Sequence, residues 1–319
     1  MLIAGVGYIG APLARAYLSR GESVVGLDNF FCTSAAALAE LRQQPAFQFI
    51  RGSISSERTL QRVFNLGPFE TIHLLAAQPS ASPVAASAAY TERTNLVGAR
   101  MLLDFAHRGG SSRVVFGSSF HVYGTPLIGH VDEQRPYGAF SDLSHLSKVY
   151  VEKLIEMYTR IHPISGVSVR LGIVYGLGPI MKTNPLFMTV PNRFSYQAAR
   201  GESLQVNPQA TAPIGFLHLR DAVTALLAAS SLPERYASAN AAGESLSVRE
   251  VAIAVRDASR LRGIAVAVNP EPAQPAIPAQ SSFTVSSRLE QLGWRPGVHL
   301  RDSVGEIIDH ARASTETGS

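Results

Sequence analysis

The sequence predicts a doubly wound α/β protein, in which helices cover both faces of a parallel sheet, with a smaller and partly interleaved α/β domain on its C-terminal side. Short apolar or β-branched runs alternate with amphipathic helical stretches through the first half of the chain. This alternation is typical of a parallel sheet wrapped by helices. The length of 319 residues exceeds the usual size of one compact core, so we expect two domains.

The predicted strands of the sheet are short apolar runs, most of them followed by a helical stretch. After Tyr175, closely spaced prolines interrupt the alternation, so 1–175 is the predicted first domain. The segment 214–232 has the pattern of a strand and a helix and is expected to return to that domain. The remaining parts, 176–213 and 233–319, form the predicted second domain. The strands are predicted at 2–4, 23–27, 47–50, 71–75, 113–116 and 167–173.

The composition narrows the class of protein. With 46% hydrophobic and 16% charged residues, the chain can bury a large core and is too apolar for disorder. The net charge is only +4 and the basic residues are scattered, which argues against a nucleic-acid partner and a polybasic membrane anchor. Cys32 is the single cysteine, and no signal peptide or membrane-spanning run is recognisable. We therefore expect a cytoplasmic protein without a membrane partner.

The first motif is the glycine-rich segment Gly5-Val6-Gly7-Tyr8-Ile9-Gly10, between the first predicted strand and the helical run 11–20. Such glycines make a tight turn, let the backbone approach a pyrophosphate, and allow the helix to pack closely on the strand. The pyrophosphate then lies at the N-terminus of the helix. An ordinary glycine-rich turn is the alternative, but the strand-turn-helix context favours a dinucleotide-binding domain of the Rossmann type.

Asp28 decides which dinucleotide is expected. It ends the second predicted strand, 18 residues after Gly10, where a carboxylate can accept hydrogen bonds from the ribose hydroxyls of the cofactor. Its charge repels a 2′-phosphate, and no arginine stands next to it in the sequence. The sequence therefore predicts NAD rather than NADP. The alternative is that Asp28 is only a turn residue before Asn29.

Together with later motifs, these residues resemble the extended short-chain dehydrogenase/reductases, the group of NAD-dependent nucleotide-sugar epimerases and dehydratases typified by UDP-galactose 4-epimerase. The resemblance spans nearly the whole chain, although Ala4 stands at the first of three glycine positions. The matching segments are 4–10, 28–29, 73–78, 95–98, 118–119, 122–124, Lys148 with Glu152, 170–176, 216–221 and 292–294.

The resemblance implies a set of cofactor contacts and a division of labour between the domains. The first domain is expected to bind NAD, and the second a nucleotide-sugar-like substrate. Ser53 stands where the family has an aspartate that reaches the adenine, and Asn95 resembles a helix asparagine near the active site. The implied cofactor-binding residues are Gly5, Gly7, Tyr8, Ile9, Gly10, Asp28, Asn29, Ser53, Ile54, Leu75, Ala76, Ala77 and Lys148.

The resemblance also implies an assembly and points to a missing phosphate contact. The helices around 95–107 and 144–160 are expected to form a homodimer interface as a four-helix bundle. In the second domain, the arginine that the family carries before an Asp-Phe pair is absent from 207–216. Its loss removes a bidentate phosphate donor.

The family's catalytic residues are a Ser or Thr, a Tyr, and a Lys four residues after the Tyr, on the same face of one helix. The lysine holds the nicotinamide ribose and lowers the pKa of the tyrosine, which exchanges a proton with the substrate. Ser119 and Lys148 match this pattern, but Ser144 occupies the position of the tyrosine. A serine is about 4 Å shorter than a tyrosine and does not titrate near neutrality, so it cannot inherit the role of the base.

Three other side chains are candidates for this vacant role. His121 follows Ser119 closely, where dehydratases of the family carry acidic groups, although packing beside the strand end is the plainer interpretation. His145 is adjacent to Ser144 but lies about 100° away around the helix, so a core-edge histidine is the default interpretation. Tyr137, in the preceding loop, is close enough in sequence to bring a phenol into the gap.

Two functions from different classes remain open. The first is an NAD-dependent epimerase or dehydratase type of oxidoreductase or isomerase, acting on a nucleotide-sugar or related polyol by transient hydride transfer. The second is an NAD-binding protein without turnover that acts as a sensor or partner subunit. No metal site is predicted because the histidines lack ligand spacing, and no Gly-x-Ser-x-Gly elbow surrounds Ser119 to indicate a hydrolase.

Overall fold

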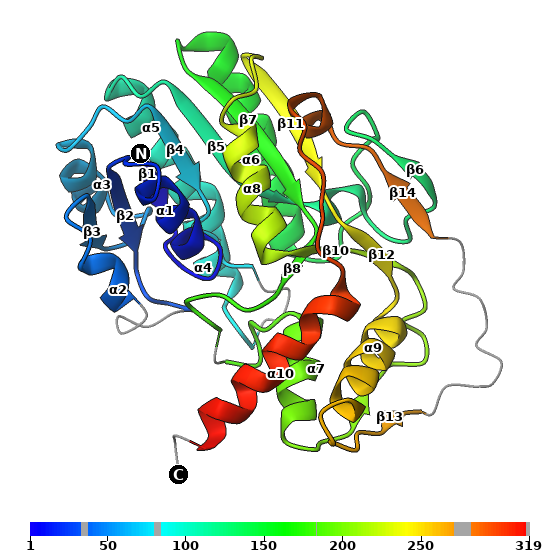
Figure 1. Cartoon of the computed structure of the whole chain (residues 1–319). Coiled ribbons are helices and arrows are strands. Elements are labelled where there is room, and N and C mark those ends of the chain that lie inside the picture. Colours follow the sequence, from blue (N-terminus) through cyan, green and yellow to red (C-terminus); the bar gives the residue numbers. More distant parts are fainter. Residues whose placement is uncertain (33–37, 80–83, 183, 271–281, 317–319) are drawn as a thin grey trace.

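The computed structural model describes residues 1–32, 38–79, 84–182, 184–270 and 282–316. Within these residues, the centre is a seven-stranded parallel sheet in the order β11-β7-β5-β4-β1-β2-β3 (Figure 1). The predicted strands are all present, with shifts of a few residues at their ends. The strands are β1 (Leu2–Ala4), β2 (Val24–Asp28), β3 (Phe47–Arg51), β4 (Thr71–Leu74), β5 (Arg113–Ser119), β7 (Ser165–Leu171) and β11 (Tyr236–Ala241).

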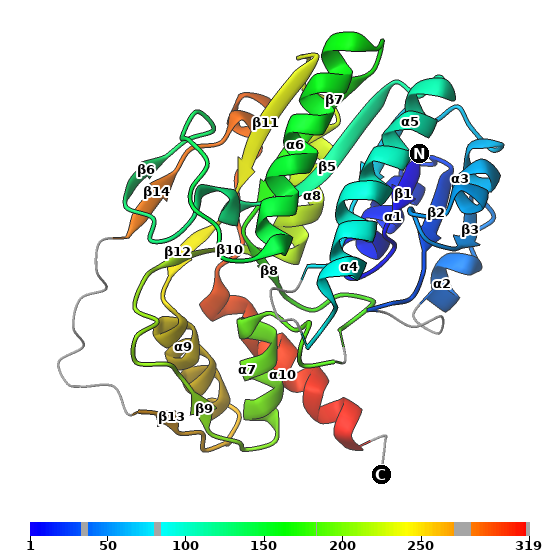
Figure 2. The ribbon, with the colours of Figure 1, turned by 180° about the vertical axis from the view of Figure 1, so that it is seen from behind.

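Helices cover both faces of this sheet, which confirms the predicted doubly wound fold (Figures 1 and 2). Ile3 packs toward one face and its neighbours Leu2 and Ala4 toward the other, because successive side chains of a strand point to opposite sides. Both faces are apolar, as a parallel sheet requires. One face packs on α1 (Gly10–Leu18), α2 (Ala39–Arg42) and α8 (Leu219–Ala229), and the other on α3 (Glu57–Phe64), α5 (Ala99–Arg108) and α6 (Leu143–Ile161).

A second lobe lies below the large sheet in Figure 1, where the chain forms a separate apolar core. The short strand pair β6–β14 lies to one side of both lobes. The elements of the second lobe are β8 (Ile173–Tyr175), α7 (Val190–Ala199), β9 (Leu204–Gln205), β10 (Ile214–His218), β12 (Glu244–Leu246), α9 (Val248–Arg260), β13 (Val268–Asn269) and α10 (Leu300–Glu316). The remaining elements are α4 (Ala88–Thr91), η2 (Glu92–Gly98), η3 (Phe120–Tyr123), β6 (Gly129–Val131), β14 (Phe283–Val285) and η4 (Arg288–Leu292).

The structure interleaves the two lobes differently from the predicted boundaries. α8 packs on the large sheet, in line with the expected return of 214–232, but β10 pairs with β8 and β12 in a small sheet of its own. β11 lies within 233–319, which was assigned to the second domain, yet it pairs in parallel with β7 as the edge strand of the large sheet. The alternation of elements identifies a strand but carries no information about which sheet it joins. The wider division into two functional domains stays a prediction.

No helix in the described part of the chain combines the length and apolar character needed to cross a membrane.

Candidate active site

A cavity of about 500 Å³ opens where the carboxyl ends of the large-sheet strands face the second lobe. β1 lies inside the sheet between β2 and β4, so the chain crosses over from one side of β1 to the other. Ligands of open α/β sheets bind in the crevice at such a switch point. The cavity is lined by the glycine turn after β1, the ends of β2, β4 and β5, the first turn of α6, and the segment from β8 to α7.

The glycine turn forms one wall of the cavity and permits an unusually close backbone approach. Gly5 has φ +105°, and a Cβ placed there would lie 2.5 Å from the backbone nitrogen of Ala76. A Cβ on Gly10 would lie 2.0 Å from the carbonyl oxygen of Gly5. Only glycine fits both positions. The N-terminus of α1 therefore opens directly onto the cavity, and its free N–H groups suit the diphosphate of a dinucleotide.

Every residue predicted to bind the cofactor lines this one cavity, together with most of the residues predicted to take part in catalysis. The roles assigned to them stay proposals, but their convergence from separate elements provides the arrangement that those roles require. They are Gly5, Gly7, Tyr8, Ile9, Gly10, Asp28, Asn29, Ser53, Ile54, Leu75, Ala76, Ala77, Ser119, His121, Ser144 and Lys148.

The surroundings of Asp28 differ in one respect from what the sequence indicated. Arg51 lies directly opposite Asp28 on β3, although no arginine is adjacent to Asp28 in the sequence. The guanidinium of Arg51 lies 5.5 Å from the ring centroid of Phe30, and only the aspartate lines the cavity. The Asp28 carboxylate also accepts a hydrogen bond from the backbone nitrogen of Phe30 at 2.7 Å, which holds it at the strand end. The expected preference for NAD therefore rests on Asp28.

Tyr8 has a second function that the glycine motif does not reveal. Its hydroxyl donates a hydrogen bond of 2.6 Å to the carbonyl of Gly176 and accepts one of 3.1 Å from the side-chain amide of Asn192. The Asn192 carbonyl in turn accepts from the backbone nitrogen of Gly176 at 3.0 Å. These buried hydrogen bonds tie the glycine turn to the second lobe. The Tyr8 side chain thus links the two lobes, and Tyr8 also lines the cavity.

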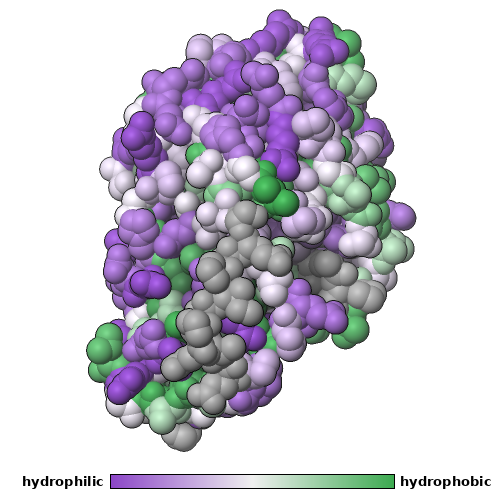
Figure 3. Space-filling view, turned by 90° about the vertical axis from the view of Figure 1, so that its right-hand side faces the viewer, coloured by the Kyte–Doolittle hydropathy of each residue, from purple (hydrophilic) through white to green (hydrophobic). Residues whose placement is uncertain are grey.

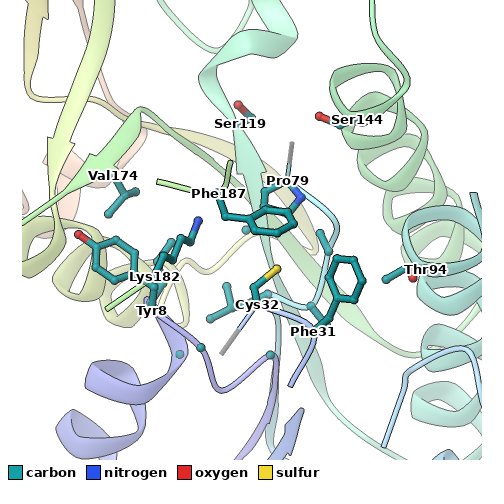
Figure 4. A pocket seen from close by; sticks show the side chains of 18 of the residues that line it. Tyr8, Phe31, Cys32, Pro79, Thr94, Ser119, Ser144, Val174, Lys182 and Phe187 are labelled. Atoms are coloured by element: carbon teal, nitrogen blue, oxygen red, sulfur yellow. The ribbon is translucent and has the colours of Figure 1, made fainter. Parts of the chain in front are cut away.

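The end of the cavity where catalysis is expected contains Ser119 and Ser144 (Figure 4). Lys148 lines the same cavity. Ser119 ends β5, whereas Ser144 and Lys148 lie one helical turn apart on α6. The ammonium group of Lys148 donates a 2.7 Å hydrogen bond to the carbonyl of Gly117 and lies above the ring of Phe116. Burial lowers the pKa of Lys148 to about 8. Lys148 therefore carries a positive charge at neutral pH. It lies one helical turn from Ser144, which occupies the position of the family's tyrosine.

Two histidines stand next to Ser119. The Oγ of Ser119 lies 3.2 Å from Nδ1 of His121. The ring of His145 stacks on that of His121, with a centroid distance of 4.4 Å and nearly parallel planes, and both line the cavity. Burial, together with the nearby His145, lowers the pKa of His121 to about 4, so its imidazole is neutral at physiological pH. A neutral imidazole can accept a proton.

His145 lines the cavity, although the sequence favoured a histidine at the edge of the core. It lies in the first turn of α6, where the cavity wraps around the helix end, so residues 100° apart both reach it. Asp142 caps this helix by accepting from the backbone nitrogen of His145 at 2.9 Å, and its other oxygen lies 2.6 Å from Nδ1 of the same residue. The carboxylate thereby orients the imidazole. Burial lowers the pKa of His145, although Asp142 opposes the shift.

Tyr137 does not fill the gap left by the missing phenol. Its hydroxyl donates a 3.0 Å hydrogen bond to Glu152, and its pKa is raised by burial and by the charge of that glutamate. The fully buried Glu152 pairs with Arg170 at 2.8 Å and accepts a short hydrogen bond from Ser118. This network joins α6 to the ends of β5 and β7. It holds Lys148, four residues before Glu152, in position relative to Ser119, which follows Ser118.

Asn95 lies behind the cavity. Its side-chain carbonyl accepts from the backbone nitrogen of Gln78 at 2.7 Å, and its amide donates to the Gln78 carbonyl and to the hydroxyl of Ser147. Asn95 therefore fixes the loop after β4 against α6, and its expected place near the active site stays a prediction.

A phosphate-binding glycine turn, an acidic residue at the end of β2, and a Ser/Lys pair around one cavity define a dinucleotide-dependent enzyme of the Rossmann class. The chain belongs to the NAD-dependent epimerase/dehydratase family, whose model matches residues 1–241. The predictions of the family, the α/β fold and NAD as the cofactor are thereby confirmed.

Known proteins of this kind match over most of the chain. UDP-glucuronic acid decarboxylase 3 of Arabidopsis thaliana is 26% identical over 318 residues, covering 95% of this chain and 86% of that protein. A UDP-N-acetyl-alpha-D-glucosaminuronate decarboxylase of Bacillus cytotoxicus is 28% identical over 232 residues, covering 72% and 70%. The structure of Thermus thermophilus UDP-glucose 4-epimerase in complex with NAD superposes with a TM-score of 0.81 at 24% identity, covering 98% and 99%. This last likeness shows the shared fold.

Several lining residues had no signal in the sequence. Phe31 and Phe187 approach each other across the cavity, with ring centroids 5.8 Å apart, and Lys182 extends into it (Figure 4). Phe187 and Lys182 come from the irregular segment between β8 and α7, where no periodicity or motif indicates which side chains face a ligand. Among the described residues, no group of His, Cys, Asp and Glu could hold a metal ion.

The buried Glu152–Arg170 pair leads to a stability prediction. Glu152→Gln keeps the volume but leaves the Arg170 charge unpaired, so we expect the free energy of unfolding to fall by about 3–5 kcal/mol in denaturant titrations. Glu156→Gln is the matched control, because Glu156 forms exposed pairs with Lys153 and Arg160 on the same helix. Its expected loss is about 0–1 kcal/mol. Equal losses for the two variants would contradict the positioning role of the buried pair.

The position of Asp28 leads to a binding prediction. NAD is expected to bind more tightly than NADP by roughly tenfold or more, because about 1.4 kcal/mol of charge repulsion on the 2′-phosphate is sufficient. Calorimetric titration of the purified protein with each cofactor measures this difference, and Asp28→Asn is expected to narrow it. Equal affinities in the natural chain, or a preference for NADP, would show that Asp28 does not select the cofactor.

Proposed function

We propose that the chain is an NAD-dependent oxidoreductase or isomerase that acts on a nucleotide-linked sugar or related polyol through transient hydride transfer. Membership of the family and relatives named for reactions of UDP-sugars support this substrate class. The observation that carries the proposal is the 3.2 Å approach of Ser119 to His121 in the same cavity as Lys148 and the glycine turn. In this arrangement His121 is the proton acceptor, a role that Ser144 cannot take.

The proposed division of roles follows from these distances. Ser119 orients the reacting hydroxyl of the sugar. As the sugar hydroxyl gives its proton to Ser119 Oγ, the Ser119 hydroxyl proton passes to Nδ1 of His121. Bound at the glycine turn, the cofactor would supply the acceptor for the hydride on the carbon that carries this hydroxyl. Lys148 holds the nicotinamide ribose and places a positive charge beside the oxygen that loses the proton. His145, oriented by Asp142, stacks on the imidazole that becomes charged, and the Asp142 carboxylate stabilises that charge.

A second function remains open because of Ser144. An NAD-binding protein without turnover, acting as a sensor or partner subunit, requires the glycine turn and Asp28 but no proton acceptor. It predicts tight NAD binding together with no exchange of hydride between NAD and any sugar. Variants at the catalytic end of the cavity separate the two functions.

The central variant is His121→Ala. General acid-base catalysis contributes about 10²–10⁴-fold, so kcat/KM is expected to fall by that factor, measured by NADH absorbance and by sugar conversion. Ser144→Tyr is expected to lower activity in the natural background, because the added ring crowds the cavity beside His145. The exposed His130 provides the matched control, His130→Ala. If Ser144→Tyr raises activity and His121→Ala has no effect, the base position is vacant and the assignment of His121 is wrong.

The pH dependence of kcat/KM tests the same groups. His121, with a pKa of about 4, accepts a proton only above that pH, and Lys148, with a pKa of about 8, loses its charge above it. We expect kcat/KM to rise through about pH 4, to stay level, and to fall through about pH 8. Lys148→Arg should move the alkaline fall to higher pH, since arginine keeps its charge. An alkaline limb that this variant leaves in place would contradict the role of Lys148.

We also propose that the protein is a homodimer through α6 and the helical segment 95–107, which spans the end of η2 and most of α5. Leu146, Tyr150, Met157 and Ile161 are exposed and lie within about 60° of one another around α6, so they form a stripe that only Lys153 interrupts. The side of the molecule that carries β6 and β14 instead shows hydrophobic residues in small groups among hydrophilic ones (Figure 3). An apolar stripe of this kind is typical of a helix-packing interface.

The dimer proposal predicts twice the chain mass at micromolar concentration in light scattering after size-exclusion chromatography. Met157→Glu combined with Ile161→Glu places charges in the stripe and is expected to give monomers. Leu261→Glu, at an even more exposed apolar position after α9, is the control and should leave the mass unchanged. A natural chain that elutes as a monomer would exclude this interface.

A further inference from the structure

Lys182 belongs to a segment of the second lobe that folds over the glycine turn. This segment follows β8, and Gly176 within it holds the hydroxyl of Tyr8. A Cβ placed on Gly178 would lie 3.6 Å from the Tyr8 ring, so the backbone there packs closely on this ring. The Lys182 ammonium lies 5.9 Å from the centroid of the same ring and lines the cavity (Figure 4). Lys182 therefore faces the cofactor turn from the opposite lobe.

The Lys182 ammonium lacks a counter-charge within the described part of the chain, where Nζ forms neither a hydrogen bond nor an ion pair. The other lining lysine, Lys148, is bonded to the Gly117 carbonyl. Burial lowers the pKa of Lys182, and burial raises the pKa of the neighbouring Cys32, so this thiol is not an anion at neutral pH. An ammonium withdrawn from water without a partner costs free energy, and an anionic ligand removes that cost.

The position of Lys182 indicates which anion is bound. The N–H groups at the N-terminus of α1 open onto the same cavity, next to Tyr8, and they favour phosphate. We propose that Lys182 binds the diphosphate of a nucleotide ligand from the side opposite the glycine turn. This inference rests on the nucleotide-binding part of the proposed function and not on its chemistry. Lys182 also provides a cation in a chain that lacks an arginine within 207–216.

Two ligands carry such a diphosphate, the cofactor and a nucleotide-sugar, and binding measurements distinguish them. NAD and ADP-ribose represent the cofactor, UDP represents the substrate, and adenosine is the probe without phosphate. Calorimetric dissociation constants are compared for the natural chain, Lys182→Met, Lys182→Arg, and the control Lys153→Gln on the surface of α6. None of these measurements requires turnover, so failure of the proposed chemistry and failure of this site are separate results.

We expect Lys182→Met to weaken either NAD and ADP-ribose or UDP by roughly 10- to 100-fold, as loss of a charge-assisted hydrogen bond implies. Lys182→Arg should restore most of the affinity, and adenosine should bind equally to all variants. Weakening of NAD identifies the cofactor diphosphate, and weakening of UDP identifies that of the substrate. If neither changes by more than about twofold, the proposal is overturned.

A second readout covers the variant's folding. Because Lys182→Met removes an unpaired, half-buried charge, the ligand-free variant is expected to have a higher Tm than the natural chain. Saturating NAD or UDP should then raise the Tm of the variant less than that of the natural chain. A lower Tm of the ligand-free variant would indicate that Lys182 already has a stabilising partner within the protein, and would overturn the proposal.

Discussion

The close contact between the glycine turn and the loop after β4 is the constraint on which the rest of the site depends. No Cβ fits at Gly5 against Ala76, or at Gly10 against the Gly5 carbonyl, so β1, β4 and α1 meet at one point. The cavity opens at that point. Tyr8 leaves the same turn and bonds to Gly176 in the second lobe, which fixes the distance between the phosphate-binding wall and the opposite wall.

The catalytic end depends on a second buried arrangement. Glu152 joins α6 to β5 and β7, so Ser119 and Lys148 keep their relative positions without the tyrosine that the family places at 144. A serine at 144 leaves space beside the first turn of α6. The rings of His121 and His145 stack at this end of the cavity, and Asp142 both caps the helix and orients one ring. The position that lacks the family's tyrosine thus lies at the same end of the cavity as His121, His145 and Asp142.

Local patterns predicted the fold and much of the site, because strand periodicity, the glycine turn and the Ser/Lys spacing are all encoded within short segments. What failed depended on long-range geometry. β11 joins the large sheet although nothing in its own residues distinguishes the two sheets. Arg51 lies beside Asp28 only through strand pairing, and Lys182 reaches the cavity only because its segment folds over Tyr8. His145 is offset by about 100° from Ser144 around α6, but both residues reach the cavity because it wraps around the end of this helix.

We propose His121, acting through Ser119, as the proton acceptor in place of a tyrosine at position 144. A crystal structure of the protein with NAD and an unreactive nucleotide-sugar analogue tests it most directly. We expect Ser119 Oγ within about 2.6–3.2 Å of the sugar hydroxyl next to the nicotinamide, with His121 Nδ1 in hydrogen-bond contact with Ser119 Oγ. A structure in which this sugar hydroxyl contacts another titrating group, with Ser119 and His121 both out of reach, would contradict the role of His121.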